Sequence, residues 1–313
     1  IIMRNDLDIA RKTGRQGRAV ALGFFDGVHI GHLRLLSRTA EAASELGLTP
    51  CVFTFDRHPM SEITGRPFPL LNTVDDRAYI IKKYSGINEI IFAHFDSALM
   101  RMPWQNFIHD MLVGMYGAEY LVAGWDYHFG YKGEGNPELL CAEAASLGIG
   151  CEIIPEVKLD GITVSSTRIR DLVSEGKMEE AARFLGHPHI LSGIVGQGKK
   201  LGRTLGIPTI NITLPQEIQQ PLRGVYASRV IVDDNGPSLP GVTNIGVKPT
   251  VSGSGDVNAE THIIGFSGDL YGKSVRLELL KFMRPENRFP DVGSLKNQIL
   301  LDIEAVKSII EDI

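Results

Sequence analysis

Between residues 18 and 157, short apolar runs alternate with longer stretches in which apolar residues recur at helical spacing. A short apolar run bounded by turn residues is typical of a buried strand, and apolar residues three or four positions apart are typical of an amphipathic helix. Strands that alternate with helices predict an α/β fold with a parallel sheet covered on both faces. Ligands of such sheets bind beyond the carboxyl ends of the strands. The runs are AVALG (19–23), CVFTF (51–55), EIIFAHF (89–95), EYLVAGW (119–125) and CEIIPEV (151–157), and the helical stretches lie near 33–43, 75–84, 103–116 and 137–147.

After residue 186 the pattern changes to short β-branched runs separated by glycine and proline. Six such runs, with few helical stretches between them, predict a small antiparallel β-barrel. The last 20 residues return to helical spacing, and their apolar stripe predicts a terminal helix packed on a sheet. We therefore expect two domains, 1–186 and 187–313. The six runs are HILSGIV (189–195), IPTINIT (207–213), VYASRVIV (225–232), GVTNIGV (241–247), THIIGF (261–266) and VRLELLKF (275–282).

Composition narrows the class of protein. The 313 residues are 43% hydrophobic and carry a net charge of -5. The chain therefore lacks the excess positive charge that favours binding of nucleic acid, and any phosphate ligand must be held by the local geometry of its site. No window of about 18 apolar residues predicts a membrane span, and no cleavable leader is evident. Three cysteines without metal-type spacing indicate reduced thiols, and we expect a cytoplasmic protein. The oligomeric state stays open.

The segment GFFDGVHIGH (23–32) follows the first predicted strand and opens the first helix. Glycines at a strand-to-helix turn let the backbone approach a phosphate, and the helix amides point toward it. His29 and His32 lie three positions apart, so both can donate toward one anion. A metal site, which needs further ligands while only Asp26 is near, and two ordinary loop histidines are the other interpretations.

VSSTRIR (164–170) stands at the start of the last helix of this half. Hydroxyl and guanidinium groups at a helix start suit the phosphates of a nucleotide. A solvated helix cap is the alternative, because serines are common at that position.

The second half contains GIVGQGKKLGRTLGIPTIN (193–211), whose glycines predict a flap over a phosphate, since no Walker pattern is present. Thr209 and Asn211 lie two apart on a strand and share a face, where a hydroxyl and an amide oxygen can hold Mg²⁺. Glu260 opens a later strand, and its carboxylate can accept a proton from an attacking hydroxyl. The polar face of a half-exposed strand is the alternative for Thr209 and Asn211, and a surface charge is the alternative for Glu260.

Taken together, the motifs of the first half resemble the nucleotidylyltransferase superfamily, which has a Rossmann-like α/β fold. Four of them occur in the order found in the FMN adenylyltransferase half of prokaryotic bifunctional riboflavin kinase/FAD synthetases. The resemblance implies that His29 and His32 bind the ATP phosphates while the FMN phosphate attacks the α-phosphorus and pyrophosphate leaves. The implied nucleotide-binding residues are Gly23, Phe25, Asp26, Gly31, Asp126, Ser166, Thr167 and Arg170. The four motifs are FDGVHIGH (25–32), FTFDRHP (53–59), GWDYHFGYKGEGN (124–136) and VSSTRIR (164–170).

The second half resembles the riboflavin kinase domain along nearly its full length. The resemblance implies transfer of the ATP γ-phosphate to the 5′-hydroxyl of riboflavin, with Glu260 as general base and Thr209 and Asn211 as ligands of Mg²⁺. Gly198 and Gly202 would flank a loop that covers the nucleotide. The matching motifs are GRTLGIPTIN (202–211), GVYA (224–227), GVTNIGVKPT (241–250), ETHIIGFSGDLYG (260–272) and FMRPENRF (282–289).

The function implied is a bifunctional enzyme that converts riboflavin to FMN and FMN to FAD, with ATP and Mg²⁺ in both steps. Two alternatives stay open: a riboflavin kinase whose adenylyltransferase half is impaired or takes another acceptor, and a flavin-binding regulator without turnover. The chain departs from the family pattern at Phe24, Arg57, Gln197, Ile207 and Ile210.

Overall fold

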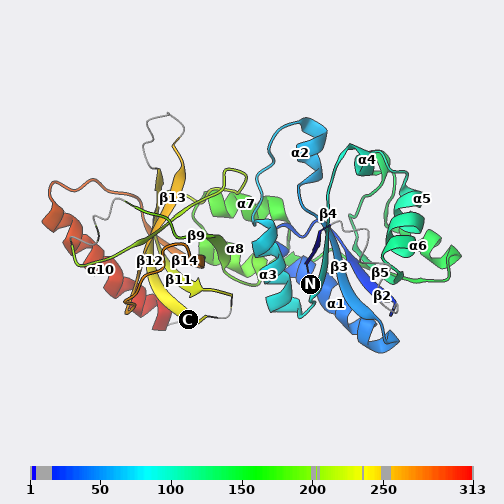
Figure 1. Ribbon diagram of the computed structural model, residues 1–313, viewed down its shortest axis with the longest axis horizontal. Helices are drawn as coiled ribbons and strands as arrows, with labels where there is room; N and C mark the ends of the chain where they lie inside the picture. The colour runs from blue at the N-terminus through cyan, green and yellow to red at the C-terminus, as the bar shows by residue number, and fades with distance from the viewer. Residues whose placement is uncertain are drawn as a thin grey trace. The chain divides into compact units, whose positions relative to one another are not determined.

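The computed structural model describes residues 2–4, 16–198, 202, 205–234, 236–247 and 255–311. Its contacts divide the chain into two compact units, coloured along the chain in Figure 1. The first comprises Ile1–Phe68 and Arg77–Ser165, and the second comprises Pro69–Asp76 and Ser166–Ile313. Among the described residues, no helix is long and apolar enough to span a membrane.

The first unit is built on a six-stranded parallel sheet in the order β1-β4-β3-β2-β5-β6. All side chains from Ala19 to Leu22 on β2 are buried, as expected for a strand covered on both faces. After β2, the strands β3 and β4 are added on one side of β2, and β5 and β6 are then added on its other side. The direction of winding therefore reverses between β2 and β5. The prediction of a parallel sheet is confirmed. The strands are β1 (Ile2–Arg4), β2 (Arg18–Leu22), β3 (Thr49–Phe55), β4 (Glu89–Ala93), β5 (Ala118–Gly124) and β6 (Gly150–Ile154).

Helices connect these strands and bury their apolar faces against the sheet. Helix α1 contacts β2, β3 and β5, and α6 contacts β5 and β6. The segment Phe107–Met115 is a π-helix, η2, a form that is rare and concentrates at functional sites. The helices are η1 (Asp26–Val28), α1 (Ile30–Leu46), α2 (Pro59–Thr64), α3 (Val74–Ser85), α4 (Ser97–Met100), α5 (Trp104–Asn106), η2, η3 (Tyr131–Gly133) and α6 (Pro137–Ser146), and a hairpin of β7 (Lys158–Leu159) and β8 (Ile162–Thr163) follows β6.

The cysteines differ from the expectation of three reduced thiols. Cys141 on α6 and Cys151 on β6 form a disulfide, with their Cα atoms 5.2 Å apart. Cys51 on β3 is buried and free. The sequence-based expectation was wrong because the two cysteines, ten positions apart, carry no spacing signal, and the packing of α6 beside β6 brings them together.

Protein denatured without reductant is therefore expected to expose one reactive thiol, Cys51, and three after reduction. Titration with a chromogenic thiol reagent in guanidinium chloride counts both. Three reactive thiols before reduction would contradict the bond.

The second unit is an antiparallel six-stranded sheet in the order β10-β13-β12-β11-β14-β9. A bridge between Gly196 and Asn211 joins the end of β9 to β10, so the sheet nearly closes on itself. Helix α10, red in Figure 1, lies along β12 and β11. The predicted barrel with a terminal helix is confirmed. The elements are α7 (Ser166–Ser174), α8 (Met178–Leu185), β9 (His189–Ile194), β10 (Ile210–Thr213), β11 (Gly224–Val232), β12 (Ser238–Val247), β13 (Val257–Ile263), β14 (Ser274–Arg284) and α10 (Val292–Glu311).

One short segment from the first half of the chain, Pro69–Asp76, groups with the second unit. The buried Asp76 carboxylate accepts a hydrogen bond from Ser192 Oγ at 2.7 Å and lies 3.3 Å from Arg276 Nε. A buried carboxylate needs such partners, and these come from β9 and β14.

Candidate functional site

The loop between β2 and α1 has an uncommon backbone. Phe25 and Val28 have φ of 57° and 45°, values that glycine adopts readily but that are costly for residues with a Cβ, above all a β-branched valine. Such conformations persist where the surrounding structure enforces them, and they concentrate at functional sites. Both side chains are fully buried. The GFFDGVHIGH segment is therefore a constrained loop.

Two glycines of this loop are fixed by packing. A Cβ atom on Gly23 would approach the Phe25 ring to 3.0 Å, and one on Gly31 would approach the His29 ring to 3.2 Å. Both distances are shorter than ordinary contacts. The glycines therefore let the aromatic and imidazole rings approach the backbone closely.

His29 and His32 form a stacked pair at the start of α1. Their ring centroids are 3.6 Å apart, with 11° between the planes. His29 caps the helix, and its Nδ1 accepts a hydrogen bond from the His32 backbone N–H at 3.3 Å. Because Nδ1 is an acceptor, the His29 proton resides on Nε2, which is then a donor. A helix N-terminus with such a donor suits a phosphate.

The His32 ring is held in its neutral form. Burial, together with repulsion from the Arg77 guanidinium and the neighbouring His29 ring, keeps the pKa of His32 well below its usual range. Its Nδ1 is buried and has no hydrogen-bond partner among the described residues. At neutral pH His32 is therefore an uncharged hydrogen-bonding group.

The loop lies where the winding of the sheet reverses. His29 follows β2 and Asp126 follows β5, and the two strands are neighbours in the parallel sheet. Asp126 is exposed, and its carboxylate lies over Gly124, where a Cβ would be 3.3 Å away. The carboxyl edge at this reversal is the usual ligand site of open α/β sheets. The structure thus brings His29, His32 and Asp126 to one edge of the first unit.

An apolar cavity of about 430 Å³ opens at the same end of the sheet, and the sequence analysis missed it. Phe55 and Phe95 contact edge to face at 5.1 Å between centroids, and Tyr127 and Phe129 stack at 5.5 Å. These rings come from the residues that end β3 and from those that follow β4 and β5. A flat aromatic ligand fits such a lining. The signal was the aromatic content of FTFDRHP and GWDYHFG.

Ser166, Thr167 and Arg170 lie in the first turns of α7, in the second unit. Arg170 Nη2 donates to Thr167 Oγ1 at 3.1 Å on the exposed side of the helix, whereas Ile169 is fully buried. That these residues bind the same nucleotide as His29 stays a prediction.

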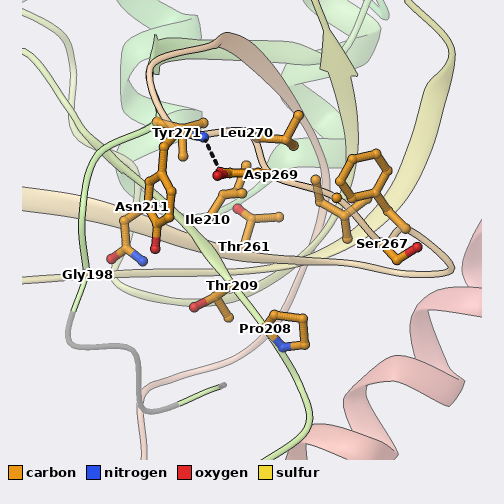
Figure 2. A pocket seen from close by; sticks show the side chains of 14 residues that line it. Gly198, Pro208, Thr209, Ile210, Asn211, Thr261, Ser267, Asp269, Leu270 and Tyr271 are labelled. Atoms are coloured by element: carbon orange, nitrogen blue, oxygen red, sulfur yellow. Dashed lines mark hydrogen bonds between the residues drawn. The ribbon is translucent and has the colours of Figure 1, made fainter. Parts of the chain in front are cut away.

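The second unit contains a cavity of about 320 Å³ at the open end of the barrel, drawn in Figure 2. Thr209, Asn211, Asp269 and Tyr271 are among the residues that line it. The Asn211 amide lies against Gly198, where any side chain would collide with it. Asn211 is 6% exposed, and its Oδ1 is buried without a hydrogen-bond partner among the described residues. A buried amide oxygen of this kind is suited to a cation or a ligand donor.

Glu260 lines a second cavity, of about 310 Å³, between the barrel and α10. On β13 it lies directly opposite Asn211 on β10 and Asn244 on β12. Residues opposite each other in antiparallel strands share a face. Thr209 lines this cavity as well as the first. Thr209, Asn211 and Glu260 are therefore brought together where the two cavities adjoin.

The predicted flap is described only in part. Gly198 lines the first cavity and Gly202 the second, where Gly202 O accepts a hydrogen bond from Ile207 N at 2.8 Å. Residues 199–201 lie outside the described residues.

Two of the departures from the family pattern have clear positions. Ile207 is 5% exposed and lines the second cavity. Arg57 is exposed and lies 3.8 Å from both Asp56 and Glu62.

Comparison with known proteins identifies a family domain in each half of the chain. The FAD synthetase family model matches residues 11–168, and the riboflavin kinase family model matches residues 185–310. Bifunctional riboflavin kinase/FMN adenylyltransferases from Pseudomonas fluorescens and Haemophilus influenzae are each 35% identical over 94% of this chain, covering 93% and 94% of those proteins. This chain belongs to the bifunctional riboflavin kinase/FMN adenylyltransferase family.

A solved structure covers the same length. A crystal structure from Streptococcus pneumoniae, described as a macrolide-efflux protein, matches 98% of this chain and 98% of its own at 28% identity, with a TM-score of 0.81. The family member of Escherichia coli K12 is 34% identical over 92% of this chain and 91% of its own length.

Membership confirms the function predicted from the sequence. The chain is a transferase of flavin cofactor biosynthesis with an FMN adenylyltransferase domain and a riboflavin kinase domain. Its substrates are riboflavin, FMN and ATP, its product is FAD, and both domains use ATP with a divalent metal.

Proposed function

We propose that the His29–His32 loop is the adenylyl-transfer site of the first unit. An FMN phosphate oxygen forms the bond to the α-phosphorus of ATP, and the bond to pyrophosphate breaks, with its electron pair leaving on pyrophosphate. The α1 amides and the His29 Nε2–H donor stabilise the charge that develops on the phosphates. The stacked pair at the reversal of the sheet supports this assignment.

FMN is proposed to bind with its ring system in the aromatic cavity. The cavity is apolar and is lined by Phe55, Tyr127 and Phe129, which suits the isoalloxazine ring. Lys132 lies on its rim and can attract the phosphate. We retain Asp126, Ser166, Thr167 and Arg170 as proposed ligands of ATP.

In the second unit we propose that ATP occupies the first cavity and riboflavin the second. The 5′-hydroxyl oxygen of riboflavin attacks the γ-phosphorus, Glu260 accepts the hydroxyl proton, and the bond to ADP breaks with its electron pair on ADP. The observation that carries this proposal is that Thr209 lines both cavities while Glu260 lies opposite Asn211. The 5′-hydroxyl of riboflavin and the γ-phosphate of ATP can then meet where the two cavities adjoin.

The residues at this point fit a divalent cation, proposed to be Mg²⁺. The buried Asn211 Oδ1 lacks a protein partner among the described residues, and the Thr209 hydroxyl is two residues away. Mg²⁺ binds proteins through few oxygen ligands and retains several waters and phosphate oxygens. When bound, it neutralises charge on the ATP phosphates.

Asn211→Leu is expected to lower riboflavin phosphorylation on the order of 100-fold and to raise the Mg²⁺ concentration required, because it removes the amide oxygen. Asn211→Asp keeps an oxygen ligand and should recover most of the activity. Steady-state rates against Mg²⁺ concentration measure both. An unchanged Mg²⁺ dependence in Asn211→Leu would contradict the site.

The test of the proposed function uses ATP labelled at either the α- or the γ-phosphate, with riboflavin and Mg²⁺. We expect the γ-label in FMN and the α-label only in FAD. FMN without FAD would favour an impaired adenylyltransferase half, and bound flavin without ATP consumption would favour a regulator.

We propose functional domains of 1–186 and 187–313. The proposed location is the cytoplasm, since both reactions consume ATP.

A further inference from the structure

A buried cation, the Arg77 guanidinium, contacts the start of the His29–His32 loop and has no part in the steps above. Arg77, on α3, is 1% exposed. Its Nη1 donates to the Phe24 carbonyl at 2.6 Å, and its Nη2 donates to the Phe55 carbonyl at 2.8 Å. The guanidinium therefore links the start of the loop to the end of β3.

The partners of Arg77 are unusual for a buried charge. Its guanidinium donates hydrogen bonds to two carbonyls and, at 3.3 Å, to the Thr54 hydroxyl, all of which are neutral oxygens. Its Nε has no hydrogen-bond partner among the described residues. Burial lowers the pKa of Arg77 to about 10, and the charges of Asp26 and Asp56 oppose that shift. A buried charge without a bonded counter-ion is costly to keep.

Phe24, a departure from the family pattern, takes part in these contacts through both its carbonyl and its ring. Its carbonyl accepts from both Arg77 and Thr54 Oγ1, the latter at 2.9 Å. Its ring lies 4.5 Å from the Arg77 guanidinium and meets the His58 ring edge to face at 4.6 Å. Phe24 directly precedes Phe25, the first left-handed residue of the loop. Fixing the Phe24 carbonyl therefore fixes the peptide plane from which the strained turn begins.

We propose that Arg77 is a positioning residue for adenylyl transfer: its guanidinium holds the Phe24 carbonyl, and with it the conformation of the loop that carries His29 and His32. Its charge also adds positive potential beneath the phosphates. This inference rests on the adenylyl-transfer site proposed above.

The charge of Arg77 has a second consequence. Besides burial, His32 faces the His29 ring on its own loop and the Arg77 guanidinium from α3, and both lower its pKa. Arg77 in turn faces Asp26 on the loop and Asp56 after β3. Removing the guanidinium charge raises the pKa of His32, so the protonated form appears at higher pH. The acid limb of the pH–rate profile then moves to higher pH.

The test compares variants of the full chain in FAD formation from supplied FMN and ATP. Arg77→Met is expected to lower kcat by about 10- to 100-fold and to shift the acid limb upward. Arg77→Lys keeps the charge and should keep the wild-type acid limb while recovering part of kcat. Thr54→Val removes only the second donor to Phe24 and should lower kcat less, with no shift in pH.

Arg18→Met is the matched control for a destabilised fold. Arg18 lies at the opposite, amino end of β2, where it donates to the Tyr116 carbonyl at 2.8 Å and pairs with Glu89 at 2.7 Å. It should lower the melting temperature and leave kcat and the pH profile unchanged.

Two results overturn the proposal: a wild-type kcat and acid limb in Arg77→Met, or an equal loss of kcat in Arg18→Met. If Arg77→Met does not fold, wild-type kcat in both Arg77→Lys and Thr54→Val overturns it. If wild-type protein forms no FAD from FMN while it still phosphorylates riboflavin, the proposed function of the first unit fails instead.

Discussion

Replacing Glu260 with Gln is expected to abolish riboflavin phosphorylation while FAD formation from supplied FMN continues. The amide cannot accept the proton of the attacking hydroxyl, and a lost general base typically costs about 10²- to 10⁴-fold in rate. Because Gln is isosteric and the position is only half-buried, the barrel should remain folded. Chromatographic separation of riboflavin, FMN and FAD after incubation with ATP and Mg²⁺ measures both activities.

Glu304→Gln is the matched control. Glu304 lies on the exposed side of α10, where it pairs with Lys307 at 2.7 Å, and it lines neither cavity. It should phosphorylate riboflavin at the wild-type rate. Full kinase activity in Glu260→Gln would show that another group accepts the proton, and loss of both activities would show that the two sites depend on each other.

Replacing His32 with Ala should have the opposite effect, a loss of FAD formation with riboflavin phosphorylation intact. His32 stacks on His29, so its removal takes away one phosphate ligand and leaves the other ring unsupported. Loss of one donor to a developing charge typically lowers kcat by about 10²- to 10³-fold. Initial rates of FAD formation from FMN, with riboflavin phosphorylation measured on the same preparation, provide the comparison.

The control for His32→Ala is His109→Ala. His109 is an exposed histidine of the same unit, paired with Glu143 at 2.6 Å on the surface. It should keep the wild-type rate of FAD formation. Equal losses in the two variants would assign the effect of His32 to stability.

Much of the fold could be predicted because the strands and helices follow from the local spacing of apolar residues in the sequence. The apolar runs at 19–23 and 119–125 became adjacent parallel strands, and the histidine loop followed the first of them as expected. In the barrel, Asn211 lies on the short strand β10 as predicted, whereas Thr209 directly precedes that strand, and both line one cavity. These features depend on residues within a few positions of each other.

Features that depend on distant partners could not be predicted. Asp76 reads as an ordinary charge at a helix start, yet its partners Ser192 and Arg276 come from the barrel. Cys141 and Cys151 carried no spacing signal, since the packing of α6 on β6 brings them together. A buried charged residue that belongs to no local motif does not alter the spacing of apolar residues, so the sequence pattern does not reveal it.

The candidate sites divide in the same way. The phosphate-binding loop was visible because glycines and histidines at fixed spacing have a local meaning. The aromatic cavity was not, because its rings come from the ends of β3, β4 and β5, and only the sheet order collects them. Arg77 was hidden for the same reason: its two carbonyl partners lie 53 and 22 residues away.

The division of the chemistry between two residue sets is tested most directly by mixing the Glu260→Gln and His32→Ala proteins in one tube with riboflavin, ATP and Mg²⁺. Each variant alone should form no FAD from riboflavin. The mixture should form FAD, because His32→Ala releases FMN that Glu260→Gln adenylylates. A mixture that forms no FAD, or either variant forming FAD alone, would contradict the assignment.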